Sequence, residues 1–267
     1  MANTRINSLR RMDALENRQE MTLTVGSLFS GIGGLDLGLE RAGMEVIWQS
    51  EIDPYCNKVL KKHWPEVTNH GNIKDIDWRT VKRPDIVCGG YPCQPFSLAG
   101  QRKGAEDPRH LWPWVRDAIS ELSPSYAILE NVRGHLTMGG LQVVGELAEI
   151  GYDAEWRVVS AAGMGAPHRR ERIIIVAYPH NSELGYIDKC GINKGSNAKR
   201  RKVFITNSPG SSTCRTNSNW ISEPNVGRVA DGIPYRVDRL RGLGNAVVPQ
   251  VAEYIGRLVM AAELNNS

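Results

Sequence analysis

Cys93 has the greatest capacity for chemistry in this chain, and it lies in the stretch Pro92-Cys93-Gln94-Pro95. The apolar run before it ends in Gly89-Gly90, which predicts a buried strand leading into a loop. A thiol in such a loop is suited to nucleophilic attack, because the thiolate is a strong nucleophile and open α/β sheets carry their sites at the carboxyl ends of parallel strands. A small apolar residue packed in a proline-rich loop is the alternative interpretation.

A second pattern, Phe29-Ser30-Gly31-Ile32-Gly33-Gly34, is typical of a ligand site. It lies between a short β-type run and apolar residues at helical spacing, which predicts a strand, a glycine turn and a helix. Such a turn brings backbone N–H groups close to a ligand at a helix N-terminus. Asp36 stands where the dinucleotide fingerprint GxGxxG has its third glycine, so the pattern favours a smaller nucleoside without a pyrophosphate. An ordinary βα turn is the alternative.

Carboxylates follow two further expected strands. Glu51 comes twenty positions after Gly31, where Rossmann-like folds hold ribose hydroxyls, although a surface glutamate would fit equally well. Glu130 begins the stretch Glu130-Asn131-Val132 after an apolar run, so it can lie beside the thiol of Cys93 at the same edge of the sheet. The charged residues 169–172 lead directly into the apolar strand 173–177. Their place at the start of a buried strand suggests that these charges have a function.

The elements that must position these residues alternate between strands and helices, which predicts an α/β fold. Expected helices cover residues 54–63, 112–122 and 139–150, and expected strands cover 23–29, 45–49, 125–129, 153–160 and 172–178. A final helix after Pro249 has one apolar face that we expect to pack on the large domain. That face consists of Val248, Val251, Ile255, Leu258 and Ala262.

Length and composition indicate four segments. The 267 residues, 41% of them hydrophobic, can bury a sizeable core. Residues 1–20 are a polar extension, 21–178 form the large domain, and 236–267 return to complete it. Residues 179–235 lack apolar periodicity and form a separate small domain or a long insertion.

The charge of the chain is concentrated in one part of it. Residues 178–235 hold eight basic and four acidic side chains, whereas the rest of the chain has 25 of each. A basic segment on a neutral body suggests a footprint for a polyanion, with a solvated surface loop as the alternative.

The remaining sequence signals concern cysteines and membranes. The five cysteines show neither a CxxC pair nor a paired metal spacing, so we expect reduced thiols, no disulfide framework and no metal. No long apolar run and no signal peptide is present, which predicts a soluble, cytoplasmic protein without a membrane partner.

With these elements placed, the sequence resembles the cytosine-C5 DNA methyltransferases of bacterial and phage restriction-modification systems. The resemblance covers about Thr22 to Ala262 and includes six motifs in the family's order. These motifs are Phe29-Ser30-Gly31-Ile32-Gly33-Gly34, Glu51, Pro92-Cys93-Gln94, Glu130-Asn131-Val132, His168-Arg169-Arg170-Glu171-Arg172 and Gly244-Asn245-Ala246-Val247.

The resemblance implies a Rossmann-like fold that uses S-adenosylmethionine, with a small, irregular target-recognition domain at 179–235. It implies that Cys93 attacks C6 of a flipped-out cytosine, that Glu130 protonates N3, and that Arg172 contacts the base. Arg170 is expected to support the thiolate or a nearby phosphate. The residues implied for cofactor binding are Phe29, Ser30, Gly31, Gly33, Glu51, Ile52, Asn72, Ile73, Pro92, Asn245 and Ala246.

The resemblance also implies partners. The expected substrate is double-stranded DNA, a cognate restriction endonuclease that acts on the same site is a possible partner, and the enzyme is expected to be a monomer that associates with the nucleoid while it acts. Two positions depart from the family pattern. Asn72 stands where the family often has Asp to contact the adenine amino group, and His168 replaces the usual Gln and receives no role.

Other functions explain fewer of these features. A zinc-dependent cytosine deaminase needs a cysteine at position 96, which is Phe96. A cysteine hydrolase leaves the glycine turn and the basic segment unexplained. An RNA cytosine methyltransferase of the same fold and a catalytically silent DNA-binding relative both remain open on the sequence alone.

Overall fold

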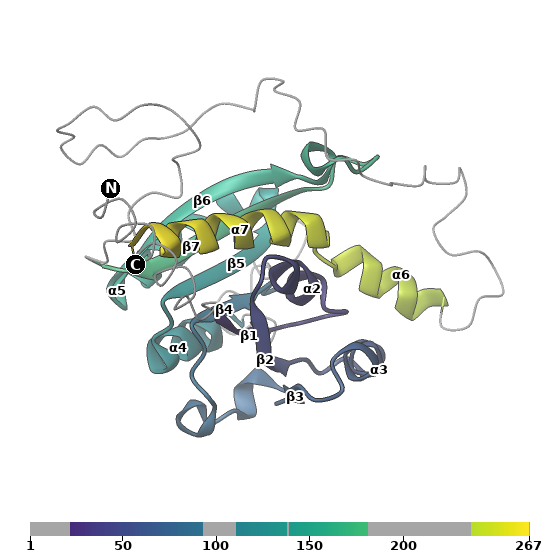
Figure 1. The fold of residues 1–267 in the computed structure, drawn as a ribbon, viewed down its shortest axis with the longest axis horizontal. Coiled ribbons are helices and arrows are strands. Elements are labelled where there is room, and N and C mark those ends of the chain that lie inside the picture. Colours follow the sequence, from purple (N-terminus) through teal and green to yellow (C-terminus); the bar gives the residue numbers. More distant parts are fainter. Residues whose placement is uncertain (1–21, 93–110, 138, 181–235, 267) are drawn as a thin grey trace, which may run out of the picture.

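The computed structural model describes residues 22–92, 111–137, 139–180 and 236–266 (Figure 1). The strands are β1 (Thr24–Leu28), β2 (Glu45–Ser50), β3 (Thr68–Asn69), β4 (Ile86–Gly89), β5 (Tyr126–Val132), β6 (Tyr152–Ser160) and β7 (Glu171–Pro179). The α-helices are α2 (Gly34–Arg41), α3 (Pro54–His63), α4 (Trp112–Leu122), α5 (Gly140–Glu149), α6 (Arg236–Asn245) and α7 (Pro249–Asn266). Short 3₁₀ turns are η1 (Ile73–Asp75), η2 (Trp78–Thr80), η4 (Arg133–Thr137) and η5 (Ala161–Met164).

The strands form one sheet in the order β3-β2-β1-β4-β5-β7-β6. Strands β1 to β5 run parallel, whereas β7 is antiparallel to both β5 and β6. The order reverses at β1, which pairs with β2 on one side and β4 on the other, so the loops after β1 and β4 flank a topological switch point. The expected Rossmann-like α/β fold is confirmed.

Each face of the sheet has its own hydrophobic core. Side chains of α4 and α5, including Ile119 and Leu147, pack with Leu28, Val87 and Leu129 on one face. Helices α2 and α7 cover the opposite face, and they lie next to each other in Figure 1. Alternation of side chains along each strand delivers apolar residues to both faces, as a sheet covered on both sides requires.

Helix α7 packs on the large domain as predicted, but with a different set of residues. Its buried side chains are Val251, Ala252, Ile255 and Val259. Leu258 and Ala262, which belong to the predicted apolar face, are only partly buried. The cause is close contact with α2, because a Cβ atom at Gly38 would lie 2.4 Å from the Cβ of Ala252.

Two helices have the predicted bounds because a side-chain cap or a first-turn proline fixes their starts. Asp53 caps α3, where its Oδ1 accepts from the backbone N–H groups of Tyr55 (2.9 Å) and Cys56 (3.0 Å), and Pro54 takes the first turn. Helix α4 likewise carries a proline in its first turn. Residues 242–245, whose two glycines are typical of a connection, form the last part of α6.

Residues 1–20 and most of the expected domain at 179–235 lie outside the described residues. None of the helices in the described ranges is long and apolar enough to cross a membrane.

Candidate active site and cofactor site

Three parallel strands end together at the edge of the sheet where the sequence predicts chemistry. Leu28 of β1 pairs with Gly89 of β4, and Gly89 pairs with Leu129 of β5. The glycine turn, the loop toward Cys93 and the Glu130 motif therefore begin side by side. Cys93 itself lies outside the described residues, which include this loop as far as Pro92.

Glu130, which is buried, and Arg172, which is partly buried, form an ion pair at this edge. The Nε of Arg172 lies 2.7 Å from Oε1 of Glu130, and Glu130 is 7% exposed. Both residues belong to adjacent antiparallel strands, β5 and β7, so the sheet register holds them near each other. Two residues expected in the active site are thus brought together.

Burial raises the pKa of the Glu130 carboxyl above its ordinary value, while Arg172 and Arg170 oppose that rise. A glutamate with a raised pKa holds its proton at a higher pH and can donate it to a ring nitrogen. The pair therefore combines a proton donor with a cation at the strand ends.

The loop toward Cys93 is fastened to β5 at its first residues. The side-chain amide of Asn131 donates to the backbone oxygen of Tyr91 at 3.1 Å. A Cβ atom at Gly90 would lie 2.9 Å from Oε2 of Glu130, so glycine there lets the loop pass close to the carboxylate. Pro92, a predicted cofactor residue, is exposed at the end of this described stretch.

Arg170 lies near Glu130 and is anchored to the C-terminal part of the chain. Its Nη2 donates to the backbone oxygens of Gly244 (2.7 Å) and Ala246 (2.5 Å). Its backbone has a φ of 32°, a conformation that residues other than glycine rarely adopt. The arginine thus links the start of strand β7 to the segment that holds the predicted cofactor residues Asn245 and Ala246.

The carboxylate of Glu51 accepts three backbone hydrogen bonds. Oε2 accepts from Gly31 at 2.8 Å, while Oε1 accepts from Ile52 (2.8 Å) and Asp53 (2.7 Å). The twenty-residue spacing seen in the sequence thus corresponds to a direct contact between the glycine turn and the end of β2. The alternative interpretation of Glu51, as a surface glutamate without a structural partner, is therefore excluded.

The surroundings of Glu51 fit a nucleoside. Ile52 is 66% exposed, which offers an apolar surface next to the carboxylate. Phe29 has a φ of 51°, and backbone conformations of this kind concentrate at ligand sites. Ser30 is buried, with its hydroxyl donating to the backbone oxygen of Ser27 at 3.1 Å, and a Cβ at Gly31 would meet only the Phe29 oxygen, at 3.9 Å. Ribose hydroxyls need an acceptor and adenine needs an apolar surface, and both are present.

The chain turns a corner after β3, at residues 70–73, and this corner lies next to Glu51. Asn69 ties the two together, because its Oδ1 accepts from the N–H groups of Glu51 and Gly71, both at 3.0 Å, and its Nδ2 donates to the Glu51 backbone oxygen at 3.1 Å. Asn72 caps the turn η1 by accepting from Lys74. The side chain of Ile73 is buried in the core, so its backbone is the part placed at the corner.

The segment between α6 and α7 lies against the glycine turn. A Cβ at Gly34 would lie 2.4 Å from the backbone oxygen of Val247, and a Cβ at Gly33 would lie 2.4 Å from the Trp64 ring. Only glycine permits these approaches. Asn245 and Ala246 therefore lie next to the turn that carries Ser30 and Gly31, as a shared cofactor site requires.

Asp36 carries a buried carboxylate. In the sequence it is notable only because it stands where the dinucleotide fingerprint has its third glycine. It is fully buried and accepts from the Ser27 hydroxyl and the Gln49 amide, both at 2.6 Å. Burial raises its pKa to about 6. The Ser30 hydroxyl lies 2.9 Å from the Ser27 hydroxyl, so the hydrogen bonds around Asp36 extend to the glycine turn and stabilise it. Its only sequence signal is an acid at a helical position that faces the sheet.

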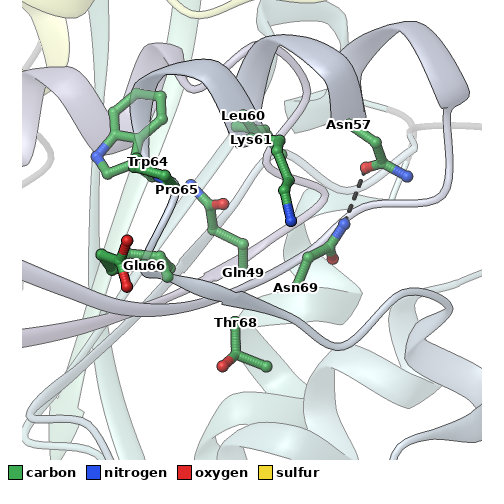
Figure 2. Close-up of a pocket in the computed structure, with 10 residues that line it drawn as sticks. Gln49, Asn57, Leu60, Lys61, Trp64, Pro65, Glu66, Thr68 and Asn69 are labelled. Atoms are coloured by element: carbon green, nitrogen blue, oxygen red, sulfur yellow. Dashed lines mark hydrogen bonds between the residues drawn. The ribbon is translucent and has the colours of Figure 1, made fainter.

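A pocket of about 390 Å³ lies between α3 and the edge formed by β2 and β3 (Figure 2). It is lined by Gln49, Asn57, Leu60, Lys61, Trp64, Pro65, Glu66, Val67, Thr68 and Asn69. None of these residues belongs to the predicted catalytic or cofactor set. Asn69, which donates to Oδ1 of Asn57 at 2.9 Å, forms the wall between this pocket and the Glu51 corner. The pocket is therefore separate from the candidate site.

Comparison with known proteins adds evidence on the family. Residues 23–219 match the sequence model of the C-5 cytosine-specific DNA methylases, which is well over half of the chain. The chain belongs to this family. This match confirms the resemblance seen in the sequence and favours a methyltransferase over the deaminase and hydrolase alternatives.

Individual relatives support the same family assignment. The chain is 36% identical over 186 residues to the Type II methyltransferase M.MthTI of Methanothermobacter thermautotrophicus, covering 65% of this chain and 54% of that protein. It is 33% identical over 178 residues to M.HhaI of Haemophilus parahaemolyticus, with the same two coverages. The chain thus spans about half the length of these curated relatives.

Solved structures show the same fold. A DNMT2 variant from Spodoptera frugiperda aligns with a TM-score of 0.56 at 24% identity, over 71% of this chain and 56% of that one. Dnmt2 of S. pombe aligns with a TM-score of 0.52 at 23% identity, over 60% and 52%.

Proposed function

We propose that this protein transfers a methyl group from S-adenosylmethionine to C5 of a cytosine in double-stranded DNA, through a covalent bond between Cys93 and C6. The observation that carries the proposal is the ion pair of Glu130 and Arg172 beside the loop that leads to Cys93, in a chain of the C-5 cytosine methylase family.

The chemistry needs activation of the ring, because C5 of cytosine is a poor nucleophile. Addition of the Cys93 thiolate at C6 makes C5 electron-rich, and a proton given to N3 by Glu130 makes that addition easier. Arg172 holds the Glu130 carboxyl in place at 2.7 Å and contacts the base. S-adenosylmethionine, when bound, supplies the methyl group that C5 accepts. Transfer of the C5 proton to a solvent base expels the thiolate from C6, and return of the N3 proton to Glu130 then restores the aromatic ring.

The cofactor would be held between the glycine turn, the ends of β2 and β3, and the segment that precedes α7. Glu51 accepts from the ribose hydroxyls, Ile52 and Phe29 provide apolar surface, and the corner at Asn72 and Ile73 faces the adenine. Ser30, Gly31 and Gly33 form the turn beneath it, with Pro92, Asn245 and Ala246 completing the site. Support comes from the hydrogen bonds of Glu51 and from the close approach of Gly34 to Val247.

The target cytosine must leave the duplex, because none of this chemistry can occur within the base stack. We assign target recognition to residues 179–235, which contain the basic segment. The names of the relatives from Haemophilus parahaemolyticus and from Bacillus phage rho11s support a bacterial or phage setting, and we propose a restriction-modification system in which a cognate endonuclease cuts the same sequence when it is unmethylated. We also propose that the protein acts as a monomer in the cytoplasm.

An assay with a radioactive methyl group on the cofactor tests the function. The purified protein is incubated with unmethylated duplex genomic DNA or with total transfer RNA, and the nucleosides are separated after digestion. We expect label in 5-methylcytosine from DNA only, and none with the Cys93→Ser variant. Label in RNA alone would favour an RNA methyltransferase, and the absence of label from both would favour a silent DNA-binding relative.

A further inference from the structure

Tyr91 and His135 form a buried hydrogen-bonded pair that belongs to neither the predicted catalytic set nor the predicted cofactor set. Oη of Tyr91 lies 2.8 Å from Nε2 of His135, and the rings meet edge to face with centroids 5.4 Å apart. Tyr91 is 4% exposed and His135 is 2% exposed. Buried hydrogen bonds between side chains are directional and fix the relative position of the segments that carry them.

The pair joins two segments of the active site. Tyr91 lies between Gly90 and Pro92, and Cys93 follows Pro92 directly in the sequence. His135 lies in η4, which begins directly after β5 and therefore after Glu130. The side-chain bond thus connects the start of the nucleophile loop, residues 90–92, to the turn that directly follows the strand carrying Glu130.

A second bond and a ring contact act on the same tyrosine. Asn131 donates to its backbone oxygen at 3.1 Å, and the Trp112 ring of α4 lies 5.2 Å from its ring. The backbone and the side chain of Tyr91 are therefore both held from the β5 side. Rotation of the loop about β4 would break both hydrogen bonds.

The chemistry of His135 indicates that the pair does more than fill space. Its Nδ1 is buried and has no hydrogen-bond partner among the described residues. An unpartnered buried nitrogen destabilises a fold, and a phenyl ring would pack at the same place without that cost. What an imidazole adds over a phenyl ring is the bond from Nε2 to Tyr91.

We propose that His135 is a positioning residue for methyl transfer, which holds the nucleophile loop next to Glu130 through Tyr91, two positions before Cys93 in the sequence. The inference rests on the proposed function of Cys93. Misplacement of a reacting group by about 1 Å can lower a rate by about a hundredfold. Loss of the Tyr91–His135 bond should therefore lower the rate of covalent attack while cofactor binding stays the same.

The experiment compares Tyr91→Phe, His135→Phe and the double variant with the wild type. The probe is duplex DNA with 5-fluorocytosine in place of cytosine, at saturating cofactor, and the readout is the first-order rate of covalent complex formation well below the melting temperature. Each single variant should react about 10- to 100-fold more slowly. The double variant should regain melting temperature, because both partners are then apolar, but it should remain slow.

Tyr152→Phe is the matched control. Tyr152 is also buried in the same core, and its hydroxyl donates to the backbone oxygen of Pro124 at 2.7 Å, away from the loop. This variant should lose thermal stability and keep the wild-type rate and cofactor dissociation constant.

The results distinguish a positioning role for His135 from a purely structural role and from a failure of the proposed function. Equal rates for all variants, or rates that follow melting temperature in every case including the control, would overturn the positioning role. A wild-type protein that forms no complex with the fluorinated DNA would instead refute the proposed function. Slow attack by the double variant with restored stability supports the inference.

Discussion

At the scale of single residues, Asp36 is the group whose environment differs most from what its position in the sequence suggests. Its carboxyl is enclosed by β1, β2 and α2, and desolvation outweighs the hydrogen bonds from Ser27 and Gln49, which raises its pKa from 3.8 to about 6. The folded state therefore binds this proton more tightly than the unfolded state does. Ionisation of Asp36 therefore destabilises the fold. A carboxylate whose pKa is lowered on folding has the opposite effect.

We expect stability to fall relative to an Asp36→Asn variant as the pH rises from about 4 to about 6. Below the unfolded pKa both states are protonated and the penalty is absent; above the folded pKa it is complete, at about 3 kcal/mol. Asparagine has the same shape and can accept from Gln49 while donating to Ser27. Urea unfolding of both proteins at several pH values measures the difference. A difference that is constant across this range would contradict the assignment.

Residue types and their order were enough to name Cys93, Glu130 and Glu51 as candidates. The contacts of Glu51 with the glycine turn, and of Glu130 with Arg172, agree with those choices. The burial of Asp36 and the Tyr91–His135 bond could not be predicted, because they depend on which strands pair and on which loop turns inward. Neither fact is encoded in the local sequence.

At the scale of elements, the contact between α2 and α7 depends on Gly38. A Cβ there would lie 2.3 Å from the backbone oxygen of Pro249, an atom that cannot move by rotating a side chain. Gly38→Ala should therefore destabilise the fold by about 1–3 kcal/mol, as overpacking does. Urea or thermal unfolding measures this change in the free energy of unfolding.

Gly145→Ala in α5 is the control. This glycine is exposed, and a Cβ there meets nothing within 4 Å. Alanine should stabilise the helix by about 0.5–1 kcal/mol, so the two substitutions should have opposite signs. Equal effects would show that α2 and α7 are not packed as closely as described.

Glu51 connects β2 to the glycine turn and is expected to hold the ribose. Glu51→Ala should weaken S-adenosylmethionine binding by roughly tenfold or more, because a charge-assisted hydrogen bond contributes about 1.5–3 kcal/mol. Calorimetric titration measures the dissociation constant. Glu45→Ala, at the exposed amino end of the same strand, should leave it unchanged. An unaltered constant for the Glu51 variant would mean that the ribose lies elsewhere.

Element bounds were predicted best where local signals fixed the helix start, namely the Asp53 cap with Pro54 in α3 and a first-turn proline in α4. The apolar face of α7 was predicted with a shifted set of residues because hydrophobic periodicity does not report small residues. Ala252 and Gly256 face α2 because the helices approach closely there. Helix α6 was missed because its two glycines, Gly242 and Gly244, are typical of a connection.

At the scale of the whole molecule, alternating strands and helices were enough to predict an α/β fold. The insertion of β7 between β5 and β6 was not predictable, since two successive apolar strands give no sign of which one pairs with β5. This insertion bears on the proposed function, because it places Arg172 next to Glu130.

The distribution of charge predicts a separable DNA-binding segment. Neutralising Lys199, Arg200, Arg201 and Lys202, which lie outside the described residues, should weaken binding to every DNA sequence and reduce the salt slope by up to about 0.9 for each phosphate interaction that is removed. Target specificity and cofactor affinity should be kept. Fluorescence anisotropy at several salt concentrations measures the slope. Lys61→Gln with Lys62→Gln, exposed on α3, is the control, and an unaltered slope for the fourfold variant would identify a solvated loop.

The central claim is that Cys93 attacks C6 of a cytosine in duplex DNA, and trapping with 5-fluorocytosine DNA tests it most directly. The fluorine at C5 cannot leave as a proton does, so the complex between protein and DNA should accumulate when S-adenosylmethionine is present. Digestion and mass spectrometry should find the modified base on the peptide that contains Cys93, and the Cys93→Ser variant should form no complex. Attachment to any other residue, or methylation of ordinary DNA by the serine variant at a substantial rate, would contradict the account.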